Sequence, residues 1–72
     1  MGMSVLYVKL LPSAITEITR VFEGYEHLAL VSTVDRETGI VKLQGTPDTL
    51  PDVVEVVHNL PFNVEILDNF SE

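Results

Sequence analysis

The residues best suited to metal or acid–base chemistry are the two histidines, His27 and His58. His58 follows Glu55 at the Glu-x-x-His spacing, which places a carboxylate and an imidazole on neighbouring positions of a helix. Di-metal bundles combine two such pairs with further carboxylates, whereas this chain has one pair and no cysteine. We therefore expect no metal site and no cofactor. A favourable interaction with the helix dipole explains His58 near the C-terminal end of a helix, and no metal is needed.

Ser13 and Arg36 are the candidate ligand-binding residues. Ser13 begins a predicted helix, where free backbone N–H groups attract negative charge, and Arg36 lies in a loop at the same end of the predicted sheet. Asp35 and Glu37 flank Arg36 and would repel the same anion. The simpler interpretation is therefore an ordinary cluster of surface loops.

Motifs for catalysis are absent from the sequence. It contains no Gly-x-Ser-x-Gly motif, no glycine-rich phosphate loop and no nucleophile with a base close by. We expect a protein that is not an enzyme.

The charge balance restricts the choice of partners. Eleven Asp and Glu stand against four Lys and Arg, for a net charge of −7. This excess of negative charge disfavours nucleic acid, which is bound by neutralising phosphates, and favours a basic protein partner. No apolar run approaches the roughly 20 residues of a membrane span, and the first residues lack the basic region of a signal peptide. We expect a cytoplasmic protein with no membrane association.

Hydrophobic periodicity predicts the elements that position these residues. Apolar residues alternate with polar ones over 4–11 and again over 62–67, which predicts two strands. Ile15, Ile18, Phe22 and Tyr25 recur at helical spacing after Ser13, the predicted N-cap. Two further strands are predicted at 28–34 and 40–45, and a second helix at 50–60.

Residue types at the boundaries predict where the second helix begins and where the domain ends. Thr49 and Asp52 resemble a capping box at the start of the second helix. A single domain over residues 4–68 is expected, followed by a flexible tail at 69–72.

The stretch DRETG joins the two central predicted strands as a turn. If Asp35 pairs with Ile40, a four-residue loop remains, with an Asp to begin a type I turn and Gly39 to adopt a positive φ. An unbroken ladder from this pair sets Val34 opposite Val41 and Ser32 opposite Leu43. We expect that register.

The order β-α-β-β-α-β predicts an α+β, ferredoxin-like sandwich. Right-handed crossovers place both helices on one face of a four-stranded antiparallel sheet in the order 4-1-3-2. The predicted core comprises Leu6, Val8, Leu10, Ile15, Ile18, Phe22, Leu28, Leu30, Val41, Leu43, Val53, Val54, Val57, Leu60, Phe62, Val64 and Ile66.

The face of the sheet without helices is the predicted interface. Its large apolar residues are Tyr7, Val31, Ile40 and Leu67, and contiguous exposed patches of this kind often mark interaction sites. Homodimerisation is the leading interpretation, because it also enlarges a small core. The alternative is the scatter of apolar residues that any protein surface carries.

The run ALVSTVDRETGIVKL, after an Ile-rich helix that ends in a Tyr, resembles a small uncharacterised bacterial family, domain of unknown function 4911. The resemblance implies a standalone cytoplasmic protein with an ACT-like fold and no assigned activity. ACT domains bind amino acids, commonly at dimer interfaces, through a glycine-bearing loop after the first strand. This chain has Leu11-Pro12-Ser13-Ala14 there, and the proline removes one N–H group from that loop.

Together these observations predict a non-enzymatic interaction or regulatory module that self-associates through the open sheet face or an edge strand. The alternative is an ACT-like sensor that binds an amino acid or small anion near the start of the first helix. A third hypothesis is a metal-responsive dimer in which His27 pairs across a two-fold axis.

Overall fold

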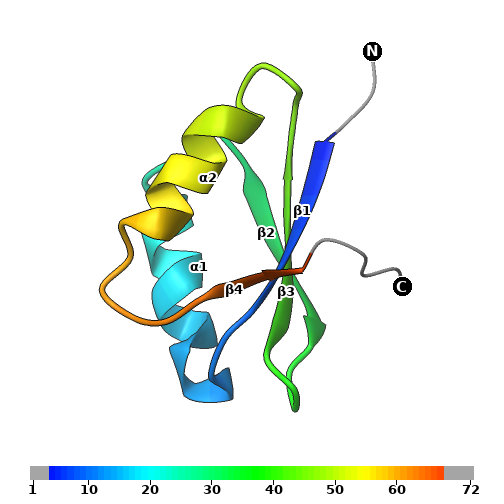
Figure 1. Cartoon of the computed structure of the whole chain (residues 1–72), viewed down its shortest axis with the longest axis vertical. Coiled ribbons are helices and arrows are strands. Elements are labelled where there is room, and N and C mark those ends of the chain that lie inside the picture. The colour runs from blue at the N-terminus through cyan, green and yellow to red at the C-terminus, as the bar shows by residue number, and fades with distance from the viewer. Residues whose placement is uncertain (1–3, 68–72) are drawn as a thin grey trace.

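A computed structural model describes residues 4–67 of the 72-residue chain (Figure 1). The predicted flexible tail at 69–72 lies outside the described residues. In chain order the elements are β1 (Ser4–Lys9), the 3-10 turn η1 (Pro12–Ala14), α1 (Ile15–Glu23), β2 (Leu30–Asp35), β3 (Ile40–Gly45), α2 (Leu50–His58) and β4 (Glu65–Leu67).

The four strands form one antiparallel sheet in the order β2-β3-β1-β4. Both helices cover the same face of this sheet, and among residues 4–67 no helix lies on the opposite face (Figure 1). The predicted ferredoxin-like layout and the strand order 4-1-3-2 are therefore confirmed. None of the described helices is long and apolar enough to cross a membrane.

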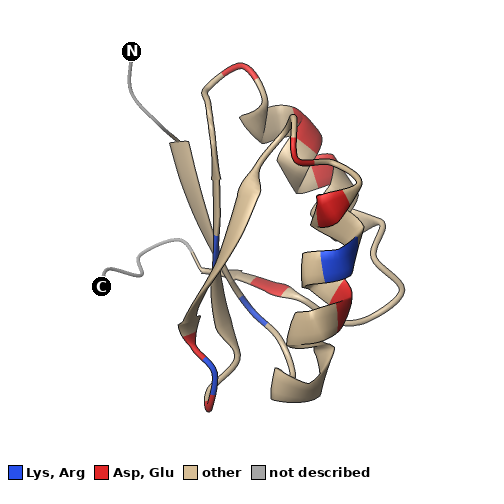
Figure 2. Ribbon diagram, turned by 180° about the vertical axis from the view of Figure 1, so that it is seen from behind, with Lys and Arg blue, Asp and Glu red and all other residues tan. Residues whose placement is uncertain are grey.

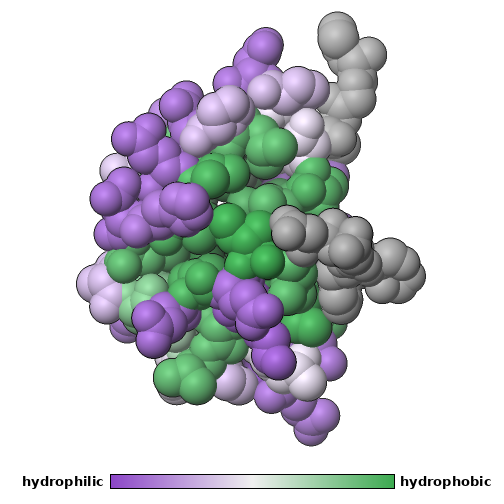
Figure 3. Space-filling view, viewed as in Figure 1, coloured by the Kyte–Doolittle hydropathy of each residue, from purple (hydrophilic) through white to green (hydrophobic). Residues whose placement is uncertain are grey.

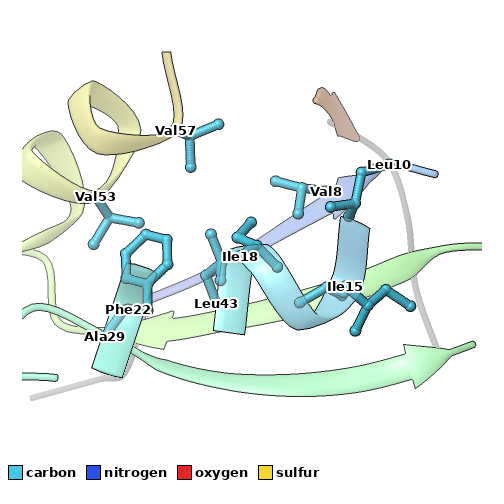
Figure 4. Packing of buried hydrophobic residues seen from close by; sticks show 10 residues of the cluster. Val8, Leu10, Ile15, Ile18, Phe22, Ala29, Leu43, Val53 and Val57 are labelled. Carbon is cyan, nitrogen blue, oxygen red and sulfur yellow. The ribbon is translucent and has the colours of Figure 1, made fainter. Parts of the chain in front are cut away.

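The core lies between the helices and the sheet. Side chains from α1, α2 and the covered face of the sheet converge there (Figure 4). Partly buried Leu6, Leu28 and Leu60 pack against this cluster, as predicted. Two predicted core residues do not belong to it: Leu30 is 59% exposed, and the half-buried Val54 is not among the residues that pack against the cluster. The buried residues are Val8, Leu10, Ile15, Ile18, Phe22, Ala29, Val41, Leu43, Val53 and Val57.

The hairpin between β2 and β3 has the predicted turn. The Asp35 carboxylate accepts hydrogen bonds from the backbone N–H groups of Glu37 (3.0 Å) and Thr38 (3.4 Å). Gly39 adopts a φ of +82° and donates its N–H to the carbonyl oxygen of Asp35 at 2.9 Å. Asp35 lies opposite Ile40, so the four-residue loop is confirmed.

The predicted register is wrong upstream of that turn, because β2 contains a bulge between Thr33 and Asp35. The extra residue shifts the ladder by one position. Val31, not Ser32, lies opposite Leu43, and Leu30 lies opposite Gln44. A regular ladder would turn the Ser32 hydroxyl toward the apolar core, where an unpaired polar group is costly. The bulge preserves the turn and packs the half-buried Val31 against the core instead.

The bulge reverses the predicted faces of β2. Ala29 is 3% exposed and belongs to the core, and Val31 packs against it. Val31 was one of the four residues predicted to form the interface on the open face. That placement is wrong. Leu30 occupies the open face in its stead.

The helix starts also differ from the predicted ones. Ala14, not Ser13, occupies the N-cap position of α1, and Ser13 lies within η1. Before α2, the Thr46 N–H donates to the Thr49 hydroxyl (3.0 Å), and the Thr49 N–H donates to the Thr46 hydroxyl (3.3 Å). This reciprocal pair replaces the predicted Thr49–Asp52 box one turn earlier.

Strand β4 is shorter than predicted and begins only at Glu65. Its partner β1 ends at Lys9, after which the Leu10 N–H donates to the carbonyl oxygen of Gly39 at 2.9 Å. On the other side of β1, the ladder with β4 ends at the Lys9–Glu65 pair. Phe62 and Val64 still pack against the core from irregular backbone.

Candidate functional site

The face of the sheet that no helix covers, here called the open face, is the largest candidate site. Its residues follow from the strand registers, because alternate residues of each strand share a face. They are Val5, Tyr7 and Lys9 of β1, Leu30, Ser32 and Asp35 of β2, Ile40, Lys42 and Gln44 of β3, and Glu65 and Leu67 of β4.

Apolar residues occupy each cross-strand row of the open face. Tyr7 pairs with Leu67 on one side and Lys42 on the other. Leu30 is 59% exposed and Val5 is 38% exposed, whereas Tyr7, Ile40 and Leu67 are half-buried. The predicted interface residues Tyr7, Ile40 and Leu67 therefore share one face.

Leu30 and Val5 enlarge this apolar surface beyond the predicted residues. Their exposed fractions exceed those of the other apolar residues of the open face. The signal for Val5 was present in the alternation of β1. Leu30 was missed because the bulge in β2 has no marker in the sequence.

The open face and the helix layer differ in charge. Lys9 and Lys42 lie on the open face together with Asp35 and Glu65, so the formal charges there cancel. The helices α1 and α2 carry several acidic residues and one Lys or Arg, which is Arg20 (Figure 2). Within residues 4–67 the excess of negative charge therefore lies away from the open face.

The Asp35 carboxylate is the described group with a clearly shifted pKa. Hydrogen bonds from the side chain and backbone of Thr38, and then from the Glu37 N–H, hold the pKa of Asp35 below its ordinary value of 3.8. These donors stabilise the charged carboxylate. The shift belongs to a turn and indicates no catalytic group.

The two candidate ligand residues, Ser13 and Arg36, line no common hollow among those described below. Ser13 is exposed and lies within η1. Arg36 lines a hollow between α1 and β2 together with Thr16 and Arg20. Ser13 does not line that hollow.

A larger hollow of about 730 Å³ lies between the end of β1 and the segment that leads into β4. Lys9, Leu11 and Phe62 are among its lining residues, and Ser13 and Arg36 are not. Its single basic residue is Lys9, which faces Glu65 in the sheet register. A hollow does exist near the start of the first helix, but with other residues than those predicted.

The histidines lie on different elements. His58 ends α2, and His27 lies before β2 with its ring 6.2 Å from the ring of Tyr25. Among residues 4–67, no group of three or more His, Cys, Asp or Glu side chains is placed to hold a metal ion.

Comparison with protein families identifies the chain. The model of the family described as Domain of unknown function (DUF4911) matches residues 8–64, well over half of the 72 residues. The chain belongs to the DUF4911 family. Comparisons with the curated proteins and with the solved structures give no match.

The DUF4911 match covers both helices and the whole β2–β3 hairpin. Within the open face it includes Leu30 and Ile40, whereas Tyr7 and Leu67 lie just outside the matched range. The resemblance noted from the sequence is thus confirmed at the level of the family. The DUF4911 description names no activity, so it assigns none to this chain.

Proposed function

We propose that this protein is a non-enzymatic interaction module of the cytoplasm that self-associates through the open face of its sheet. The observation that carries the proposal is the one-sided cover of the sheet. Two helices bury one face, while the other presents five large apolar side chains: Val5, Tyr7, Leu30, Ile40 and Leu67. A second copy is the proposed occupant of this face.

The arrangement of charges favours pairing of two copies face to face. Within one cross-strand row, Lys9 lies between Glu65 and Ile40. A two-fold axis through the face brings each residue of one copy toward a different residue of the other. This one row contains both signs and an apolar residue, which is compatible with such self-complementary pairing.

The size of the open face sets the expected affinity. Four strands about 4.8 Å apart and six residues with a rise of about 3.4 Å give a face of roughly 20 by 20 Å. This area is small beside the roughly 800 Å² that each partner buries in a standard interface. We therefore expect a weak dimer, with a dissociation constant in the micromolar range.

Sedimentation equilibrium between about 5 and 500 μM protein tests the proposal, since that range brackets a micromolar constant. Wild type is expected to change from monomer to dimer, and the double variant Leu30→Lys, Ile40→Lys is expected to stay monomeric. Leu11→Lys is the matched control, because Leu11 is 72% exposed but lies off the open face. It is expected to dimerise like wild type.

Added lysines lower the overall repulsion between copies that each carry a net charge of −7. If the double variant does not dimerise, the cause is therefore the change to the open face and not the change in net charge. A wild type that is monomeric at 500 μM, or a dimer abolished by Leu11→Lys alone, contradicts the proposal.

A second candidate function is binding of a small carboxylate, such as an amino acid, in the hollow of about 730 Å³ near the start of the first helix. Lys9 supplies a positive charge there, and Leu11 and Phe62 supply apolar walls. A ligand that binds only the native state raises the melting temperature. An amino-acid panel that leaves the melting temperature unchanged excludes this function.

A further inference from the structure

A groove of about 480 Å³ lies between α1 and α2, lined by residues of both helices and of the segments that follow them. It shares no residue with the open face and only Pro61 with the hollow beside β1. Its lining residues are Val21, Tyr25, Leu28, Asp52, Glu55, Val56, Asn59, Leu60 and Pro61.

The floor of the groove is apolar and held in place by the core. Leu28, Val56 and Leu60 each pack against the buried cluster while lining the groove. Tyr25 is 41% exposed, and its ring meets the buried ring of Phe22 edge-on, with centroids 6.4 Å apart. The groove is therefore a preformed apolar surface with one accessible aromatic ring.

The rim of the groove presents hydrogen-bond acceptors. Asp52 and Glu55 are three residues apart in α2, so their carboxylates lie on one side of that helix. The Asn59 side-chain N–H donates to the carbonyl oxygen of Glu55 at 2.8 Å, which leaves the Asn59 Oδ1 as an acceptor. No lining residue is basic. Hydrophilic residues over α2 lie beside a hydrophobic area in the space-filling view (Figure 3).

We infer that this groove binds a basic amphipathic helical segment of a different protein. Apolar side chains of that segment pack on Leu28, Val56 and Leu60, and its lysines or arginines reach Asp52 and Glu55. The ring of Tyr25 offers a further contact to a cation. Helices that dock in a groove present apolar anchors at positions i, i+3, i+4 and i+7.

The dimensions and the charge both point to this occupant. The lining extends along α2 from Asp52 to the C-cap residue Asn59, about 10 Å at 1.5 Å per residue, which matches two turns of a docked helix. A second copy of this chain is a poor occupant, because it has eleven acidic and four basic residues. Its own helices would bring further carboxylates to the rim.

Fluorescence polarisation with a labelled 14-residue peptide tests the inference. The probe contains leucines at the i, i+3, i+4, i+7 spacing and lysines elsewhere, and the matched control peptide carries glutamates in place of the lysines. Wild type is expected to bind the lysine peptide and not the glutamate peptide. The double variant Asp52→Asn, Glu55→Gln is expected to bind the lysine peptide at least about tenfold more weakly, a loss of about 1.4 kcal/mol.

Glu17→Gln with Asp48→Asn is the matched control, because it removes the same charge from residues outside the groove. This control is expected to change binding less than about twofold. An equal loss in both double variants would mean that net charge alone attracts the peptide, and the inference would fail. It would also fail if wild type did not bind the lysine peptide, or if bound peptide left the NMR methyl signals of Val56 and Leu60 unchanged.

Discussion

Replacement of Gly39 by alanine tests how tightly the hairpin is joined to the rest of the fold. Gly39 has a φ of +82°, and a Cβ atom built there would lie 1.8 Å from the carbonyl oxygen of Leu10. The same glycine accepts a hydrogen bond from the Leu10 N–H at 2.9 Å. The substitution therefore strains the turn and forces the hairpin away from the end of β1.

The expected loss of stability is the sum of two terms. A residue with a side chain in the left-handed region costs about 1–2 kcal/mol. Separation of Leu10 from Gly39 removes a hydrogen bond with a net value of about 0.5–1.5 kcal/mol. We expect Gly39→Ala to lower the free energy of unfolding by roughly 2.5 kcal/mol, which in a domain of this size lowers the melting temperature by about 10–20 °C.

Urea and thermal unfolding followed by circular dichroism measure this loss. Gly24→Ala is the matched control, because Gly24 has a φ of −81° and its added Cβ would meet nothing closer than the Val21 carbonyl oxygen at 3.5 Å. The control is expected to be neutral or to gain up to about 1 kcal/mol. A Gly39→Ala protein within about 0.5 kcal/mol of wild type would refute the reasoning.

Two further predictions concern β2 and its turn. Because hydrogen bonds from Thr38 and Glu37 lower the pKa of Asp35 in the folded state, its stabilising contribution is complete above the ordinary value of 3.8 and is lost as the pH falls through the lowered pKa. Acid titration of the free energy of unfolding is expected to fall more steeply below pH 3.8 for wild type than for Asp35→Asn, and parallel curves would contradict this. At a few micromolar protein, Leu30→Lys is expected to change stability by less than about 0.5 kcal/mol, whereas Val31→Lys is expected to lose at least about 1.5 kcal/mol. Denaturant melts in which Leu30→Lys loses more stability than Val31→Lys would contradict the bulge and support the register without it.

The fold was predictable because its main signals are local and periodic. The spacing of Ile15, Ile18 and Phe22 marks the buried side of α1, and all three are buried. The Asp35 and Gly39 types define the turn, and the structure places both as expected. These signals fix the order of elements, and handedness rules then fix the sheet order.

The register of β2 was not predictable from the same signals. Leu30 and Val31 are both large and apolar, so alternation does not decide which of them faces the core. The energy of the whole hairpin decides it, because the turn fixes Asp35 while burial favours Val31 over Ser32. One extra residue in β2 allows both the Asp35 turn and the inward position of Val31. No residue type in this stretch predicts such a bulge.

The candidate site was predictable in part. Tyr7, Ile40 and Leu67 followed from alternation alone, whereas Val31 was misplaced by the bulge. The groove between α1 and α2 was missed for a different reason. Its lining joins positions far apart in the sequence, and their meeting depends on how the helices pack.

The bulge in β2 also affects how copies of this chain can assemble. β2 is the outermost strand beside β3, so among residues 4–67 its outer backbone groups are available to another strand. The irregularity between Thr33 and Asp35 interrupts that row of amides and carbonyls. Such interruptions discourage edge-to-edge growth of sheets. A bulge at this position therefore disfavours growth of the sheet through β2, which is compatible with the closed pair proposed above.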